Sequence, residues 1–270
     1  MTIAMAWVGK QKDGLRHLYF ASDSRTRGGG GVFNSCPKVL TLPRSDCAIC
    51  FAGNLDWSYL LMAQLSNAIA AHKPSRNRKL DIAHLKDHLL RVATDLVNSM
   101  IDTYADFETK SAKFIFGGYS WRSCNFLLWT IYFDVKQKSF IARPSSNLHP
   151  RLPQAAFIGD WATRFRGQLI RHLNENLDGR DAEHEPLIEL SNLLKRTDIT
   201  DTIGGAPQVV RIGAHMNTRT FCVPWNGSLT LFGRPLFDYE NCDYWSIDPE
   251  NGIIEPPPPI KRRHQKSDDN

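Results

Sequence analysis

Blocks of strand-like and helix-like sequence alternate along this chain, and their order restricts the folds that it can adopt. A hairpin is predicted first, from strands at 2–9 and 16–23 that the turn KQKDG joins, and a short apolar strand follows at 46–53. Helices are predicted over 56–72 and 81–100, because apolar residues recur there every three or four positions.

The second half repeats this order, with strands, two further helices at about 161–177 and 185–196, and final strands. The predicted strands are 113–121, 125–135, 139–146, 155–160, 206–213, 218–225 and 228–234. Runs of strands that alternate with helix pairs do not suit a doubly wound parallel fold, in which single helices alternate with single strands. We therefore predict an α+β fold, a four-layer αββα sandwich of two mostly antiparallel sheets covered by helix pairs on both outer faces.

Composition favours one large domain with a short tail. The chain has 270 residues, of which 42% are apolar, enough for a sizeable core. From about residue 246 the sequence becomes polar, proline-rich and basic, with EPPPPIKRRHQK near its end, so we predict a domain over 1–245 and a disordered tail over 246–270. The tail is interpreted as solubilising, with a role in binding a partner or nucleic acid as the alternative.

Charge and hydropathy restrict the partners. The formal net charge of +5 includes +2 from residues 260–270, and the rest is weak evidence for a nucleic-acid partner. No run of 18 apolar residues exists, and the start MTIAMAWV is too short and lacks the basic leader of a secretory signal, so no membrane association is predicted. Six cysteines are ordinary for a reducing compartment, and we predict a cytoplasmic location.

A threonine follows the initiator methionine directly, at the start of the first predicted strand. If Met1 is removed, Thr2 carries both a hydroxyl nucleophile and an α-amine that can take the hydroxyl proton. An α-amine with a pKa near ~7.8 is only about 15% unprotonated at pH 7. A fixed cation nearby would lower that pKa and increase the fraction able to act as a base.

Three further stretches follow Thr2 in a defined order. Asp23 ends the second strand in FASDSRTRGG, Lys38 lies 15 residues later in NSCPKVLTL, and Gly53 ends the third strand in ICFAGNLDW. This order resembles the proteasome β-subunits and the related peptidase subunit of bacterial ATP-dependent heat-shock proteases, which are N-terminal nucleophile (Ntn) hydrolases. AFIGDWATRF and DTIGGAPQVVRI resemble later parts of the same pattern, so the resemblance covers roughly residues 2–233.

The resemblance implies a threonine-type peptidase or amidohydrolase. Thr2 would be the nucleophile, Lys38 the cation that lowers the pKa of its amine, and Asp23 the group that keeps the lysine charged and aimed. The backbone N–H of Gly53 would donate to the oxyanion. The substrate would be a peptide or a small amide, with no cofactor and no metal ion. The family also implies a homo-oligomeric ring, with an ATPase or another protein as a candidate partner.

Several positions depart from the family pattern and keep a second interpretation open. Asp160 and Ile203 stand where the family places serines, and Thr200 stands where it places an aspartate, with Asp201 adjacent. The register is also open, because Met1 instead of Thr2 could occupy the nucleophile's place, and a one-residue shift reverses the face of every side chain in a strand. The alternative function is a catalytically inactive proteasome-like scaffold or a partner-binding ring subunit.

Three other motifs are interpreted as structural. Cys47 and Cys50 in CAIC point to opposite faces of a strand, which favours burial over a zinc or redox pair. His84 and His88 share a helix face but have no obvious third ligand, so we predict a solvated face. RTRGGGG, at 25–31, lacks the Gly-Lys-Ser/Thr of a phosphate loop and is predicted to be a mobile segment near the site.

Overall fold

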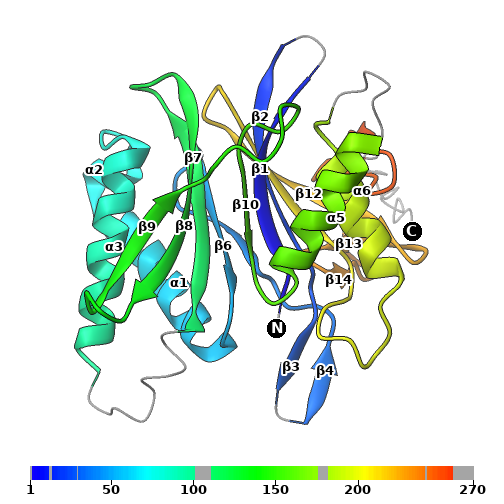
Figure 1. Ribbon diagram of the computed structural model, residues 1–270, viewed down its shortest axis with the longest axis horizontal. Helices are drawn as coiled ribbons and strands as arrows, with labels where there is room; N and C mark the ends of the chain where they lie inside the picture. The colour runs from blue at the N-terminus through cyan, green and yellow to red at the C-terminus, as the bar shows by residue number, and fades with distance from the viewer. Residues whose placement is uncertain are drawn as a thin grey trace, which may run out of the picture.

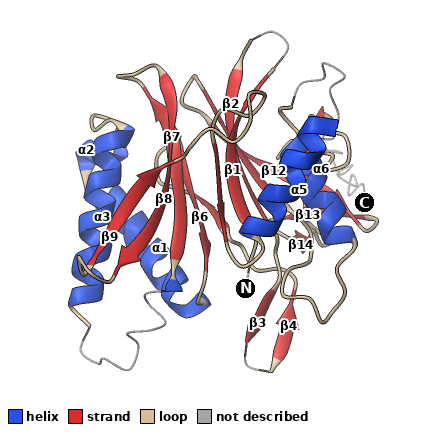
Figure 2. Cartoon of the chain, viewed as in Figure 1, coloured by secondary structure: helices blue, strands red, loops and turns tan. Residues whose placement is uncertain are grey.

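The computed structural model describes residues 2–11, 14–28, 30–100, 111–175, 182–240 and 242–257. Two large sheets face each other, with helices on their outer sides, and a small hairpin projects from the body near the N-terminus (Figure 1). The helices are α1 (Leu55–Ala71), α2 (Lys73–Arg76), α3 (Ile82–Asn98), α5 (Ala162–Glu175) and α6 (Glu185–Lys195). Figure 2 shows that α1, α2 and α3 lie on one side of the molecule and that α5 and α6 lie on the other.

The nine-stranded sheet has the order β10-β1-β2-β11-β12-β13-β14, with β15 beside β12 and β16 beside β15. The five-stranded sheet has the order β5-β6-β7-β8-β9, and β3 and β4 form the projecting hairpin. The pairs formed by the described strands are antiparallel, except for β12 with β15. The strands are β1 (Ala4–Lys10), β2 (Arg16–Ser22), β3 (Thr26–Gly28), β4 (Gly31–Phe33), β5 (Val39–Thr41), β6 (Cys47–Ala52), β7 (Lys113–Ser120), β8 (Asn125–Asp134), β9 (Ser139–Pro144), β10 (Ala155–Ile158), β11 (Gln208–Gly213), β12 (Thr218–Trp225), β13 (Ser228–Leu231), β14 (Arg234–Pro235), β15 (Ser246–Ile247) and β16 (Ile254–Glu255).

The core consists of three apolar clusters that follow the two faces of the strands. In β1, Met5 and Trp7 pack with α5 and α6, whereas Ala4 and Ala6 pack with residues of the five-stranded sheet. Successive side chains of a strand point to opposite faces, so a strand buried on both sides reads as the continuous apolar run IAMAWV. The third cluster lies between the five-stranded sheet and helices α1 and α3.

The predicted four-layer αββα sandwich of two sheets is wrong. The chain forms three mostly antiparallel sheets, and the described residues contain five helices. The third sheet is the β3–β4 hairpin, which projects away from both large sheets (Figure 1). The nine-stranded sheet is also extended by β15 and β16, where one pair runs parallel. The architecture is an α+β fold.

Two segments that we predicted to lack regular structure form strands. RTRGGGG contributes β3 and part of β4, with Thr26 paired to Phe33. The predicted tail begins with β15 and β16, and Ile247 is fully buried in the cluster under α5 and α6. The predicted boundary at residue 245 therefore falls inside the ordered chain. Residues 258–270, the rest of the predicted tail, lie outside the described residues.

The helices, cysteines and histidines of the same ranges bear on membrane crossing and metal binding. No helix there is both long enough and apolar enough to span a bilayer. Cys47 and Cys50 are fully buried, which confirms their predicted burial, and they pack into different apolar clusters. His84 is exposed as predicted, but His88 is half-buried beside His72, and burial lowers the pKa of His88. The described residues hold no group of three or more His, Cys, Asp or Glu arranged for a metal ion.

A buried polar cluster centres on Glu183, before α6. Its Oε1 accepts a hydrogen bond from the Tyr19 hydroxyl at 2.9 Å and lies 3.0 Å from His17 Nδ1. Burial acts to raise the pKa of the Glu183 carboxyl, but His17, His184 and Tyr19 outweigh this effect and hold the pKa below its ordinary value. The carboxylate therefore stabilises the fold above the ordinary pKa of glutamate, and this contribution is lost as the pH falls through the depressed pKa.

We expect Glu183→Gln to lower the free energy of unfolding by about 1.5–3 kcal/mol at pH 7, because charge-assisted hydrogen bonds are lost. The difference from the wild type should shrink at an acidic pH below the depressed pKa of Glu183, where the wild-type carboxyl is protonated as well. Urea unfolding of the variant and the wild type at pH 7 and at the acidic pH measures this difference in the free energy of unfolding. Glu250→Gln, at an exposed ion pair with Lys195, is the control, with an expected effect below about 1 kcal/mol. An equal loss at both pH values would contradict the assigned charge.

Candidate active site

Three of the four residues predicted from the sequence meet at the end of the sheets near the N-terminus. Lys38 Nζ donates a hydrogen bond to Thr2 Oγ1 at 3.0 Å and lies 2.8 Å from Asp23 Oδ1. The side chains of Lys38 and Asp23 are only 2% and 0% exposed, and Thr2 is buried as well. A hydroxyl, an ammonium and a carboxylate therefore form a short chain of contacts that is largely shielded from water.

Strand register accounts for this meeting. Thr2 precedes β1 and Asp23 follows β2, and the antiparallel register pairs Ala4 with Ser22, so both residues lie at the same end of the hairpin. Lys38 directly precedes β5, the first strand of the opposite sheet. In the register that the structure adopts, Thr2 lies beside the lysine.

The Asp23 carboxylate has two donors on each oxygen. Oδ1 accepts from Lys38 Nζ and from the Ile3 N–H, and Oδ2 accepts from the N–H groups of Arg25 and Gly204 at 3.2 Å each. Burial raises the pKa of the Asp23 carboxyl, although Lys38 and these N–H groups act against it. Because all four contacts are made by donors, no acceptor remains for an acidic proton, and we assign the pair as carboxylate and ammonium.

Gln208, at the start of β11, joins the strands that carry Asp23 and Lys38. Its Oε1 accepts from the Lys38 N–H at 2.9 Å, and its Nε2 donates to the carbonyl groups of Cys36 and Asp23 at 2.6 and 3.3 Å. Sequence analysis missed this residue. A lone amide side chain in the mostly apolar run APQVVRIG was the available signal, since a buried amide needs several partners.

Two glycines border the site in backbone conformations that favour glycine. Gly53, the predicted oxyanion donor, follows β6 with φ at +116°, and it lies two residues from Phe51, whose N–H donates to the Lys38 carbonyl. Gly159 follows β10 with φ at +102°, and a Cβ there would lie 1.9 Å from the Thr2 carbonyl oxygen. Gly159 thus allows the backbone to pass directly against Thr2. Hydrogen bonds place Thr2, Asp23 and Lys38 together, and Gly53 is connected to them only through its strand.

The positions that depart from the family pattern have different surroundings. Ile203 is fully buried in the apolar cluster under α5 and α6, whereas Asp160 is exposed after Gly159. Near Thr200, Asp201 presents its carbonyl oxygen to Arg25 at 3.2 Å. Backbone atoms of this loop thus contact the chain next to Asp23, and an apolar side chain replaces the serine of the pattern.

Comparison with solved structures then shows which fold this is. The chain is similar in fold to Anbu proteins. It aligns with Anbu (ancestral beta-subunit) from Yersinia bercovieri at a TM-score of 0.56 and 17% identity, over 81% of this chain and 86% of that one. A Gly-1 mutant of Anbu from Hyphomicrobium sp. strain MC1 aligns at 0.55 and 16%, over 81% and 85%. At these identities the likeness concerns the fold alone.

The resemblance drawn from the sequence is corrected by these comparisons. These two solved structures are ancestral beta-subunits, whereas the sequence pattern was assigned to the proteasome β-subunits and the heat-shock peptidase subunits. No protein-family model matches the chain. No curated protein matches it either. One of these neighbours is named an ancestral beta-subunit, so a β-subunit-like fold is compatible with the comparisons.

Proposed function

We propose that the chain is an N-terminal threonine hydrolase that cleaves amide bonds in peptides through Thr2 after removal of Met1. The observation that supports this most directly is the hydrogen bond from the buried Lys38 Nζ to Thr2 Oγ1. A buried lysine that contacts a hydroxyl can hold it in place and stabilise the alkoxide that forms as it attacks. A lysine with only a structural role would need the carboxylate but not the threonine.

In the proposed reaction the freed α-amine of Thr2 takes the proton from Oγ1, and Oγ1 attacks the carbonyl carbon of the substrate. The Lys38 ammonium disfavours a second positive charge nearby and so lowers the pKa of the amine. The leaving amine takes the proton, and an ester on Thr2 remains until water hydrolyses it. Asp23 positions Lys38 through the 2.8 Å contact.

The test combines intact mass spectrometry, a covalent probe and hydrolysis assays. We expect the purified protein to lack Met1 and to be labelled at Thr2 by a peptide epoxyketone, which reacts with an amine and a hydroxyl on one residue. Thr2→Ala should abolish labelling and reduce the hydrolysis of fluorogenic peptides at least ~10³-fold, whereas Thr2→Ser should retain both. Retention of Met1 on the mature protein, or unchanged activity in Thr2→Ala, would refute the proposal.

A second candidate function is an inactive proteasome-like scaffold or a partner-binding ring subunit. The buried Ile203, in place of a polar side chain beside the site, favours it. This candidate predicts a stable oligomer with no labelling at Thr2. A small-amide hydrolase would share the mechanism of the first proposal and differ in its substrate.

Assembly and location are part of the same proposal. We propose a homo-oligomeric ring in the cytoplasm, to which an ATPase or another protein delivers substrate. The aromatic side chains of Phe237, Tyr239 and Tyr244 are 54%, 78% and 48% exposed, and such side chains are enriched in protein interfaces. Native mass spectrometry of the full chain would measure the number of subunits, and a monomer at micromolar concentration would contradict the ring.

A further inference from the structure

A basic groove begins beside the candidate active site and runs between the two sheets. It consists of two adjoining cavities of about 530 and 220 Å³, which share Thr130, Phe157, Ala162 and Thr163 in their walls. Gly159, whose backbone touches the Thr2 carbonyl, lines the larger cavity. Lys113 also lines it and pairs in β7 with Ala52, the residue before Gly53. One end of the basic groove therefore lies against the candidate nucleophile.

Positive charge predominates in this groove. Lys113 and Arg143 line the larger cavity, Arg166 lines the smaller one, and neither cavity has an acidic residue in its wall. All three side chains belong to exposed residues, and within the described ranges none of them forms an ion pair with a carboxylate. Low-dielectric walls lined by charge of one sign raise the local concentration of ligands of the opposite sign.

An unsatisfied hydroxyl is a second and independent sign of a ligand. Tyr132 lines the larger cavity, and its hydroxyl oxygen is buried without a hydrogen-bond partner among the described residues. The Arg143 guanidinium carbon lies 5.1 Å from the centre of the Tyr132 ring, so the cation lies over the face of the phenol ring. A buried hydroxyl without an acceptor is unfavourable, and an anionic oxygen bound between Arg143 and Tyr132 would satisfy both groups.

We propose that the basic groove binds the carboxylate side chains of an acidic peptide, next to the bond that Thr2 attacks. This inference rests on the proposed function, because only a hydrolase at Thr2 would make the groove a substrate-binding region. The binding itself can be measured without hydrolysis. Lys113 and Arg143 supply the charge nearest to Thr2, Tyr132 donates a hydrogen bond, and Arg166 extends the field along the groove. A substrate with glutamates or aspartates near the cleaved bond is thereby favoured over a neutral one.

The test uses full-length Thr2→Ala protein and two fluorescein-labelled peptides, Ala-Glu-Glu-Glu-Ala and Ala-Gln-Gln-Gln-Ala, in fluorescence polarisation. We expect the glutamate peptide to bind about tenfold more tightly at low salt and to lose this advantage at high salt. Lys113→Glu/Arg143→Glu should remove the preference, whereas Lys79→Glu, an exposed lysine between α2 and α3, should not. Tyr132→Phe should weaken binding of the glutamate peptide about three- to tenfold without lowering Tm.

Each outcome bears on the inference. Equal affinity for both peptides, or an equal loss in Lys79→Glu, would overturn it, because general surface charge would then explain the binding. Displacement of the glutamate peptide by inorganic phosphate at equal concentration would also overturn it, since the groove would then be a phosphate site. If the glutamate peptide binds as expected but the wild type neither cleaves peptides nor labels at Thr2, the proposed function fails and the groove remains a binding site.

A second inference comes from a thiol pair at β12, the strand beside β11 in the nine-stranded sheet. Cys222 in β12 is fully buried, Cys242 is half-buried, and their Sγ atoms are 2.7 Å apart. This separation is shorter than the distance between two sulfur atoms in ordinary non-bonded contact. It approaches the S–S bond length of a disulfide, which is about 2.05 Å. The Cys222 N–H also donates to the Trp245 carbonyl at 2.9 Å, so the returning segment is already aligned with β12.

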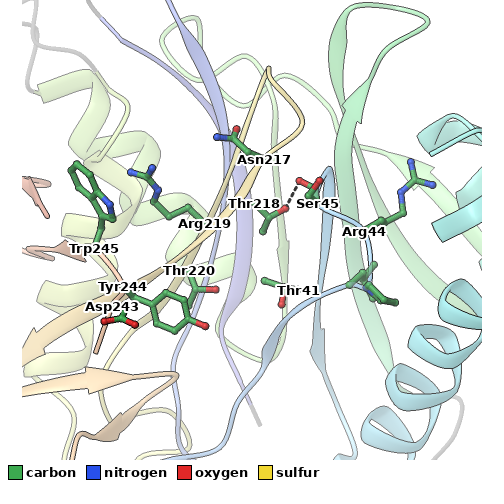
Figure 3. A pocket seen from close by; sticks show the side chains of 12 residues that line it. Thr41, Arg44, Ser45, Asn217, Thr218, Arg219, Thr220, Asp243, Tyr244 and Trp245 are labelled. Carbon is green, nitrogen blue, oxygen red and sulfur yellow. Dashed lines mark hydrogen bonds between the residues drawn. The ribbon is translucent and has the colours of Figure 1, made fainter. Parts of the chain in front are cut away.

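The thiol pair lies next to a pocket of about 540 Å³ between β12 and the β5–β6 turn (Figure 3). Thr218 and Arg219 of β12 form one part of its wall, and Tyr244 and Trp245 form another, with Arg219 stacked over Trp245 at 4.5 Å. Thr218 Oγ1 donates to the Ser45 carbonyl across the pocket. A bond between Cys222 and Cys242 would hold residues 243–245 against β12 and fix this wall.

The geometry points to a reversible disulfide between Cys222 and Cys242, formed by exchange with a small-molecule disulfide such as oxidised glutathione. The more accessible Cys242 thiolate attacks the small disulfide and releases one thiol. The Cys222 thiolate then attacks the mixed disulfide at Cys242 and releases the second, so that two protein thiols are oxidised and one disulfide is reduced to two thiols. Burial raises the pKa of the Cys222 thiol, which makes Cys242 the first to react.

Thiol counting and mass spectrometry of the full chain test this second inference. After treatment with oxidised glutathione we expect a loss of two thiols, a Cys222–Cys242 crosslinked peptide, and a Tm higher by about 5–10 °C. Cys242→Ser should abolish all three changes, and Cys124→Ser, at an exposed cysteine in the β7–β8 turn, should abolish none. A stable glutathione adduct on Cys242, or an unchanged thiol count, would overturn the inference.

Discussion

Lys38→Met is expected to lower the free energy of unfolding by about 3–5 kcal/mol and to abolish any hydrolysis that depends on Thr2. The reason for the first effect is that Asp23 would remain as a buried carboxylate without its cation, and removing one partner of a buried ion pair leaves an uncompensated charge. The reason for the second is that the Thr2 hydroxyl would lose the donor at 3.0 Å that positions it. Lys38 also lowers the pKa of the α-amine that acts as the base, and loss of general-base assistance reduces rates by ~10²–10⁴-fold.

Urea unfolding and fluorogenic peptide assays measure the two effects separately. Lys195→Met, at the exposed pair with Glu250, is the matched control, and we expect it to change the free energy of unfolding by less than about 1 kcal/mol. Lys38→Met/Asp23→Asn should recover part of the stability, because the uncompensated charge is gone, but none of the activity. If Lys38→Met unfolds at the wild-type urea concentration, the buried pair is not the contact that holds this end of the sheets together.

Gly159→Ala is expected to destabilise the chain by about 3 kcal/mol or more and to disrupt the site without replacing a polar side chain. The added Cβ would lie 1.9 Å from the Thr2 carbonyl oxygen, and the φ of +102° is itself unfavourable for an alanine. Either β10 or the chain at Thr2 has to shift, and a shift of about 1 Å in a reacting group is enough to cost ~10²-fold in rate.

Gly167→Ala provides the control for this substitution. Gly167 lies within α5, and nothing lies within 4 Å of the position that its Cβ would occupy. Alanine favours a helix over glycine, so we expect a gain of about 0.5–1 kcal/mol. Thermal and urea unfolding measure the stability of both variants. A loss in Gly159→Ala but not in Gly167→Ala indicates local strain at Gly159, and a loss in both indicates a general effect of an added methyl group. Wild-type stability in Gly159→Ala would mean that the chain near Thr2 can move freely.

Local sequence patterns predicted the longer elements closely. The apolar stripe predicted a helix over 81–100, and α3 runs from Ile82 to Asn98, with Asp81 as the N-cap that the structure shows. Helix α1, predicted over 56–72, runs from Leu55 to Ala71 with Asn54 as its N-cap. These elements could be predicted because helix periodicity and caps depend on residues within a few positions of each other.

The site was only partly predictable for the same reason. Thr2, Asp23 and Lys38 lie on a short stretch whose spacing could be compared with a known pattern, and they meet in the structure. Gln208 lies 170 residues from Lys38 and joins it only because β11 pairs with β2, which local sequence does not encode. The polarity of Gln208 marked it as unusual in a strand, but nothing near it in sequence indicated its partners.

Residue order and periodicity therefore established the alternation of strands and helix pairs, the burial of Cys47 and Cys50, and which side chains could carry the chemistry. The packing of distant segments established the number of sheets, the strands at 26–33 and 246–255, the contact of Gly159 with Thr2, and the basic groove that starts there. The physical reason is range: propensity and periodicity act over one or two turns, whereas strand register and the gap between two sheets depend on the whole chain at once.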